Sequence, residues 1–167
     1  MQPNRYRFPT LSTESVEFFH NDTMLMVIEE GVIKPFADIS LSILDLLSTE
    51  LDADEEATEA LNKMRITDPA LRLEQFATCR YGDFNNRPDI HGGDRDLEYY
   101  DCGQRGVCKF EGRLCKRMNA QYGVLTRAEL RIIKLVTSDL SDEEIACRLF
   151  LSIHTIHTHT RARSFQR

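Results

Sequence analysis

The sequence predicts a mainly α-helical protein built from three successive segments. These are an N-terminal helical module (residues 1–78), a small cysteine-rich connector of the metal-binding type (79–117) and a C-terminal helix-turn-helix (118–167). Three observations support this fold class. Apolar residues recur at helical spacing in the first segment, four of the five cysteines lie among glycines in the second, and two capping boxes open apolar stripes in the third.

The N-terminal segment contains three stretches that we expect to be helices. The first, ISLSILDLLSTEL over 39–51, has dense apolar spacing with Ser40 as its N-cap. The second, 54–64, places its glutamates early and its lysine late, as the helix dipole favours. The third begins at Asp68 with a first-turn proline. Upstream, residues 22–33 fit either a helix or a buried strand, and we interpret the whole segment as helical.

Length and composition describe a globular chain and exclude several classes of protein. The 167 residues are 41% hydrophobic and 29% charged, which is ordinary for folded domains. The sequence has no apolar run long enough for a transmembrane helix and no apolar stretch of a signal peptide at its N-terminus. We therefore expect a cytoplasmic protein with no membrane partner. We find no nucleophile–base pair, phosphate loop or paired carboxylates, so we do not expect an enzyme.

The net charge of −6 is distributed unevenly along the chain. Residues 1–78 carry 6 basic and 15 acidic side chains, 79–117 carry 8 and 7, and 118–167 carry 7 and 5. The final stretch, 150–167, has three arginines and no acid. Because screening limits charge effects to about 8 Å in cells, an acidic module does not prevent a separate basic end from meeting phosphates. The acidic run 52–56 is either a solvated helix start or a face that binds a protein partner.

Four cysteines in the middle segment are candidate metal ligands. They are spaced C-x22-C-x5-C-x6-C, and glycines between them allow the sharp turns that would aim thiolates at one ion. Four thiolates would form a closed structural zinc site; an iron–sulfur cluster is the alternative cofactor, and unligated cysteines are the third interpretation. The spacing resembles that of WhiB-like iron–sulfur regulators, although it lacks their C-x2-C pair. The candidate ligands are Cys79, Cys102, Cys108 and Cys115.

The C-terminal segment has the signals of three helices. Thr126 with Glu129, and Ser141 with Glu144, form capping boxes, and Ser152 opens a further helix. The last two helices are joined by only two residues, 150–151, which predicts a helix-turn-helix. That unit sets its second helix in the major groove of DNA.

The same segment resembles the LuxR-type (GerE-like) DNA-binding domain over residues 125–159. The residues that carry the resemblance are Leu125-Thr126-x-x-Glu129, Leu140-Ser141-x-x-Glu144-Ile145-Ala146, Arg148-Leu149, Leu151-Ser152, Thr155-Ile156 and His159. The resemblance implies a transcription regulator that binds double-stranded DNA, usually as a dimer. By the family pattern, the helix over 141–149 supports and the helix over 152–163 reads the bases.

Six residues of the reading helix are candidate DNA contacts. Ser152 caps the helix, and Arg161 is the preferred contact because arginine binds both phosphate and guanine edges. A merely solvated helix face is the alternative interpretation. The candidates are Ser152, His154, Thr155, His157, Thr158 and Arg161.

The segment also departs from the family pattern after His159. Arg163 and Arg167 stand where apolar residues are expected, and the sequence does not continue into the fourth helix that often forms the dimer contact. A homodimer is still compatible with the sequence, but it would form without the usual dimer helix of the family. This departure supports an alternative function, a protein-interaction or redox/metal-sensing module whose helix-turn-helix is truncated and binds DNA weakly or not at all.

Overall fold

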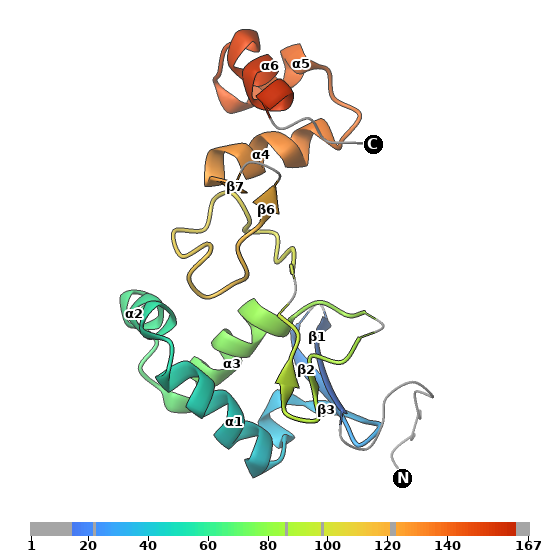
Figure 1. Ribbon diagram of the computed structural model, residues 1–167, viewed down its shortest axis with the longest axis vertical. Coiled ribbons are helices and arrows are strands. Elements are labelled where there is room, and N and C mark those ends of the chain that lie inside the picture. Colours follow the sequence, from blue (N-terminus) through green and yellow to red (C-terminus); the bar gives the residue numbers. More distant parts are fainter. Residues whose placement is uncertain (1–14, 22, 86, 98, 121–122, 163–167) are drawn as a thin grey trace. The chain divides into compact units, whose positions relative to one another are not determined.

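A computed structural model describes residues 15–21, 23–85, 87–97, 99–120 and 123–162. Its contacts divide the chain into two compact units (Figure 1). The N-terminal unit comprises Met1–Cys102 and Gly112–Lys116, and the C-terminal unit comprises Gly103–Glu111 and Arg117–Arg167. Each unit has its own buried core.

The N-terminal unit contains a five-stranded antiparallel sheet. The strand order is β3-β2-β1-β4-β5, and Phe18 of β1 pairs with Val27 of β2 in the central register. Antiparallel pairing also joins β2 to β3, β1 to β4 and β4 to β5. The strands are β1 (Ser15–Asn21), β2 (Met24–Glu29), β3 (Val32–Pro35), β4 (Ile90–His91) and β5 (Asp94–Arg95).

Two hairpins of this sheet turn through two-residue loops with positive φ angles. Glu30 (φ 52°) and Gly31 (φ 73°) connect β2 to β3, while Gly92 (φ 57°) and Gly93 (φ 91°) connect β4 to β5. Positive φ at both central positions is the type I′ geometry, whose twist matches that of paired strands. The Glu-Gly and Gly-Gly dipeptides are therefore the places in the sequence that indicate these two hairpins.

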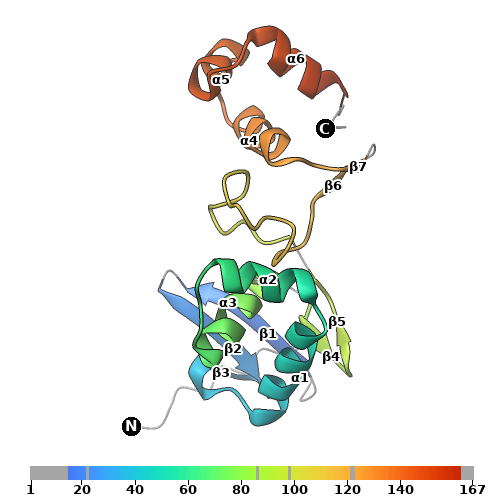
Figure 2. The same ribbon diagram turned by 90° about the vertical axis from the view of Figure 1, so that its left-hand side faces the viewer.

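One 3₁₀ turn and three α-helices complete the N-terminal unit. Asp54 accepts a hydrogen bond from the Ala57 N–H and caps α2, and Asp68 does the same for α3 through the Leu71 N–H. Helix α3 packs against β1, and α1 packs against both α3 and α2 (Figure 2). The elements are η1 (Phe36–Asp38), α1 (Leu41–Asp52), α2 (Glu55–Lys63) and α3 (Pro69–Tyr81).

The core of this unit lies between the sheet and α3. The Phe18 ring stacks on Tyr81 with centroids 5.8 Å apart and lies 6.3 Å from the Phe36 ring. Val27 beside Phe18 is fully buried, as is Leu47 from α1. The packed aromatic cluster therefore holds sheet and helices together through apolar burial.

The prediction of an N-terminal helical module is wrong, because much of this region is a sheet. The helices expected over 39–51, 54–64 and from 68 onward are present, but residues 15–35 form three strands. An apolar run such as LMVI fits a buried strand as well as a helix. Tertiary pairing decides between them here, since β2 is an interior strand that is hydrogen-bonded to β1 on one side and to β3 on the other.

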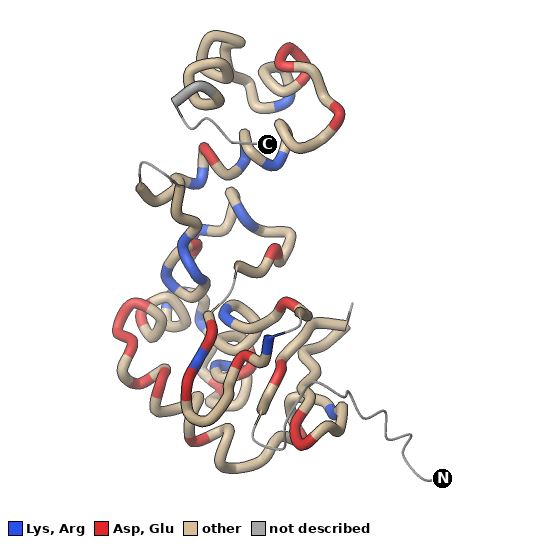
Figure 3. The backbone as a smooth tube through the Cα atoms, turned by 45° about the vertical axis from the view of Figure 1, so that its right-hand side comes forward, with Lys and Arg blue, Asp and Glu red and all other residues tan. Residues whose placement is uncertain are grey.

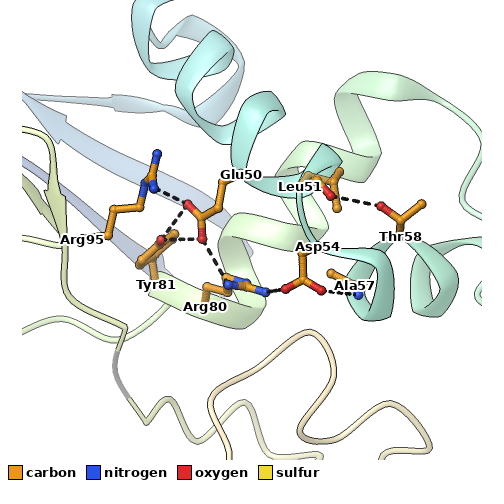
Figure 4. A network of polar contacts seen from close by, with 8 residues as sticks. All are labelled: Glu50, Leu51, Asp54, Ala57, Thr58, Arg80, Tyr81 and Arg95. Carbon is orange, nitrogen blue, oxygen red and sulfur yellow. Dashed lines mark hydrogen bonds and ion pairs between the residues drawn. The ribbon is translucent and has the colours of Figure 1, made fainter.

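The largely buried carboxylate of Glu50 links α1 to α3 and to the edge strand β5 (Figure 4). Glu50 of α1 lies 3.1 Å from Arg80 Nη1 and 3.2 Å from Arg95 Nε, and each of its oxygens is 3.0 Å from the Tyr81 hydroxyl. Arg80 also contacts the carboxylate of Asp54. Burial, and then the adjacent Glu50 charge, raise the pKa of Tyr81, so its hydroxyl stays protonated and donates.

The C-terminal unit is a three-helix bundle preceded by a small hairpin. Its fully or nearly fully buried residues Ile132, Ile145, Ala146 and Ile156 come from all three helices and meet in one cluster. Leu135, Leu140 and Leu149 surround the cluster. The elements are β6 (Asn119–Ala120), β7 (Gly123–Val124), α4 (Arg127–Val136), α5 (Asp142–Leu149) and α6 (Ile153–Ala162).

We predict that Arg80→Ala destabilises the N-terminal unit by about 3–5 kcal/mol, because it leaves the buried Glu50 carboxylate without its main partner. Urea unfolding followed by near-UV circular dichroism of the tyrosines measures the loss. Lys63→Ala is the control, since it breaks the solvent-exposed pair with Glu59. Equal effects of the two substitutions would contradict a structural role for the buried pair.

Candidate nucleic-acid interface

Helices α4 and α5 begin at capping boxes, as the sequence predicts. Thr126 accepts a hydrogen bond from the Glu129 N–H at 3.3 Å, and the Glu129 carboxylate accepts one from the Thr126 N–H at 2.8 Å. Ser141 and Glu144 repeat both distances at the start of α5. Each box satisfies two backbone donors, so both helix starts are fixed by local sequence.

The turn between α5 and α6 is short because α5 ends in a left-handed residue. Phe150 has φ 55° and ψ 43° and caps the C-terminus of α5. Its N–H donates to the Cys147 carbonyl at 3.3 Å, and the Leu151 N–H donates to the Ala146 carbonyl at 2.9 Å. These bonds satisfy carbonyls that the helix end leaves open and redirect the chain into α6.

Helix α6 has one buried side and one exposed side. The Ser152 hydroxyl accepts from the Thr155 N–H at 3.0 Å and caps the helix, and Ile156 is fully buried in the bundle core. On the other side, His154, His157 and Thr158 are exposed, and Thr155 is half-buried. The side chain of Arg161 lies outside the described residues. The roles of these six residues in DNA binding remain predictions.

The exposed surface of α6 also carries a His–Asp pair that the sequence analysis does not predict. His157 Nε2 lies 2.9 Å from the carboxylate of Asp142, the first residue of α5. Both side chains are partly exposed, at 46% and 44%. A carboxylate therefore stands beside the middle of α6 and neutralises part of its positive charge whenever His157 is protonated. Only the packing of α5 against α6 reveals this pair, since the two residues are fifteen positions apart.

A second feature that sequence reasoning missed is a loop that packs on α4. The largely buried Arg105 side chain lies 3.6 Å from the carboxylate of Glu111, which also accepts from the Gly106 N–H at 2.7 Å. Gly106 has φ +86°, and a Cβ there would lie 2.6 Å from the side chain of Arg131 in α4. The segment Gly103–Glu111 is therefore part of the C-terminal unit, and this close approach requires glycine.

The metal-type connector of the predicted fold class is not found. Within the described ranges, no three or more His, Cys, Asp or Glu side chains are grouped where they could hold a metal ion. Cys108 belongs to the C-terminal unit and the other three predicted ligands to the N-terminal unit; Cys79 accepts from the Gln75 side-chain amide at 3.2 Å. The assignment of these four cysteines as ligands of zinc or of an iron–sulfur cluster stays a prediction.

Charge is distributed between the units as the sequence indicates. Acidic residues recur along α1 and α2 in the N-terminal unit (Figure 3), and the first turn of α2 holds both Glu55 and Glu56. In the C-terminal unit the acids of α5 occupy its first turn, at Asp142, Glu143 and Glu144. There their negative charges interact favourably with the positive end of the helix dipole. Helix α6 contains no acidic residue at all.

Comparison with known proteins identifies the C-terminal segment. Residues 123–163 match the family model GerE, described as bacterial regulatory proteins, luxR family. This chain carries a LuxR-type helix-turn-helix. The resemblance inferred from residues 125–159 is thereby confirmed, and a LuxR-type domain indicates a DNA-binding transcription regulator. No curated protein and no solved structure matches the chain.

The matched segment extends from β7 to the end of α6 and therefore contains the whole three-helix bundle. None of the helices in the described part of the chain is both long and apolar enough to span a bilayer.

We predict that the capping box of α5 stabilises the LuxR-type domain at neutral pH and not in acid. The Ser141 N–H and then its hydroxyl lower the pKa of Glu144 below its ordinary 4.5. The stabilisation is therefore complete above that value and is lost as the pH falls through the lower, folded-state pKa. Glu144→Ala should lower the Tm measured by circular dichroism at pH 7, and the difference from the unsubstituted protein should shrink toward pH 3.

Glu143→Ala is the matched control, because it removes a neighbouring charge that makes no capping contact in the box. A Tm difference for Glu144→Ala that stays constant from pH 7 to pH 3 would contradict this role of the carboxylate.

Proposed function

We propose that this protein is a transcription regulator that binds duplex DNA and reads base edges with α6 in the major groove. The observation that carries the proposal is that α6 has one side buried in the bundle core and the other exposed to solvent. Ile156 anchors the helix in the bundle core, while His154, His157 and Thr158 face solvent along the opposite side. A helix held rigidly by one face and presenting polar side chains on the other is the arrangement that helix-turn-helix proteins insert into the major groove.

The chemistry of the exposed side also supports a nucleic-acid ligand. Imidazole nitrogens and a threonine hydroxyl can donate to phosphate oxygens and to base-edge acceptors. Ser152 and Thr155 add hydroxyls at the N-terminus of α6, where the backbone N–H groups and the helix dipole favour an anion. Arg161 in the last turns of α6 is the proposed cationic contact.

The N-terminal unit is the proposed sensing or partner-binding part of the regulator. Its acidic α1 and α2 disfavour contact with phosphates and suit a basic protein surface. We also propose that the protein acts in the cytoplasm, where a transcription regulator meets its DNA.

The proposal is tested by measuring binding of the full chain to a fluorescent random-sequence duplex library at two salt concentrations. We expect binding at 50 mM salt that weakens strongly by 200 mM, because each phosphate contact releases counterions. The double substitution His154→Ala and His157→Ala should weaken binding at low salt, while Lys63→Ala in the N-terminal unit should not. No detectable binding even at 50 mM salt would exclude this function and favour the interaction or sensing module.

We predict that Asp142→Asn strengthens DNA binding, because the carboxylate pairs with His157 and repels phosphates. Exposed ion pairs of this kind contribute about 0.2–1 kcal/mol, so the expected gain in affinity is up to about fivefold. Anisotropy titration of the duplex pool at low salt measures it.

Glu143→Gln is the control for this substitution, since it removes the same charge from the neighbouring position in the first turn of α5. If the two variants gain affinity equally, the effect comes from net charge alone and the specific role of the Asp142–His157 pair is refuted.

A further inference from the structure

The start of α6 exposes apolar side chains that the polar reading surface does not explain. Phe150 is 94% exposed, and Leu151 and Ile153 are 39% and 40% exposed. These three residues, which we call the apolar tip, surround the helix cap Ser152. Scattered exposed apolar residues are ordinary on a protein surface, but here three of them lie within four successive positions.

The backbone at the apolar tip makes the exposure of Phe150 more unusual. A φ of 55° is favourable for glycine and uncommon for a bulky residue. Glycine at this position would close α5 with less strain and would expose no aromatic ring. The folded domain therefore gains nothing in stability from Phe150, which directs attention to a ligand.

Three observations favour DNA as that ligand over a second protein. The first residues of a reading helix are the ones that reach base edges in helix-turn-helix complexes, and Ile153 is the first residue of α6. No acidic residue occurs from 150 to 162, so nothing in this stretch repels a polyanion. A stable protein interface needs about 800 Å² on each partner, whereas an aromatic side chain covers only about 150–250 Å².

The base edges of the major groove offer one apolar group, the C5-methyl of thymine. We therefore propose that Ile153, with Phe150 beside it, contacts thymine methyl groups and makes this protein select thymine at one or two positions of its site. The inference rests on the proposed function and goes beyond it, because it assigns specificity to side chains that form no hydrogen bond. His154, in the same turn, reads polar groups of the adjacent base pair.

The experiment removes the methyl group from the DNA. Duplexes enriched from a random library by the full chain are resynthesised with each thymine replaced singly by deoxyuridine, which differs only by that methyl. We expect the replacement to weaken binding about three- to fivefold at one or two positions, in line with the loss of one buried methyl contact. At the other thymines the affinity should not change.

Variants of the protein then assign the contact to the apolar tip. In Ile153→Ala the penalty for deoxyuridine should disappear, because the side chain that senses the methyl is gone. Phe150→Gly should bind the thymine duplex more weakly while its Tm is equal to or higher than that of the unsubstituted chain. Val136→Ala, which truncates a 38% exposed apolar residue at the end of α4, is the matched control and should keep the full penalty.

The outcomes separate this inference from the proposed function. If no duplex is enriched, both are wrong. If duplexes bind but deoxyuridine costs nothing at every position, or if the penalty is the same in Ile153→Ala, only the thymine contact is overturned. A Phe150→Gly variant that loses self-association in sedimentation velocity, with an unchanged penalty, assigns the apolar tip to a second copy of this chain and also overturns the inference.

Discussion

The N-terminal unit depends on the requirement that a buried carboxylate be fully paired. Glu50 is only 10% exposed, and Arg80, Tyr81 and Arg95 each contact it. These partners come from α3 and β5, so one side chain of α1 fixes the position of a helix and a strand at once. Arg80 then extends the network to Asp54, the cap of α2. Because an unpaired charge in this position would be strongly destabilising, the network specifies one packing of the helices on the sheet.

The LuxR-type domain follows a different logic, in which apolar burial positions the helices and local capping sets their ends. Ile132, Ile145 and Ile156 hold one face of each helix in a common core. The opposite face of α6 is then free for polar and apolar side chains that the domain does not need for folding. His154 and Ile153 are therefore held by the same rigid helix. Hydrogen bonds from one and apolar contact from the other can both contribute to sequence specificity without destabilising the domain.

Sequence reasoning succeeded where the signal is local and failed where it is not. The capping pairs Thr126–Glu129 and Ser141–Glu144 lie three residues apart, so their hydrogen bonds are visible in the sequence. The strands at 15–21, 24–29 and 32–35 are not predicted by the sequence, because apolar runs of this kind fit two structures and pairing with other segments makes the choice. The turn signals at 30–31 and 92–93 would have indicated hairpins, since both dipeptides contain the glycine that positive φ favours.

The sequence by itself determined the helix-turn-helix, its family and the concentration of acid in the N-terminal half. It did so because caps, apolar periodicity and charge are properties of neighbouring residues. Only the tertiary structure decided that residues 15–21 and 24–29 are strands, that the Asp142 carboxylate lies beside His157, and that Phe150 and Ile153 remain uncovered. Each of these depends on distances between segments that are separated in sequence, which spacing alone does not specify.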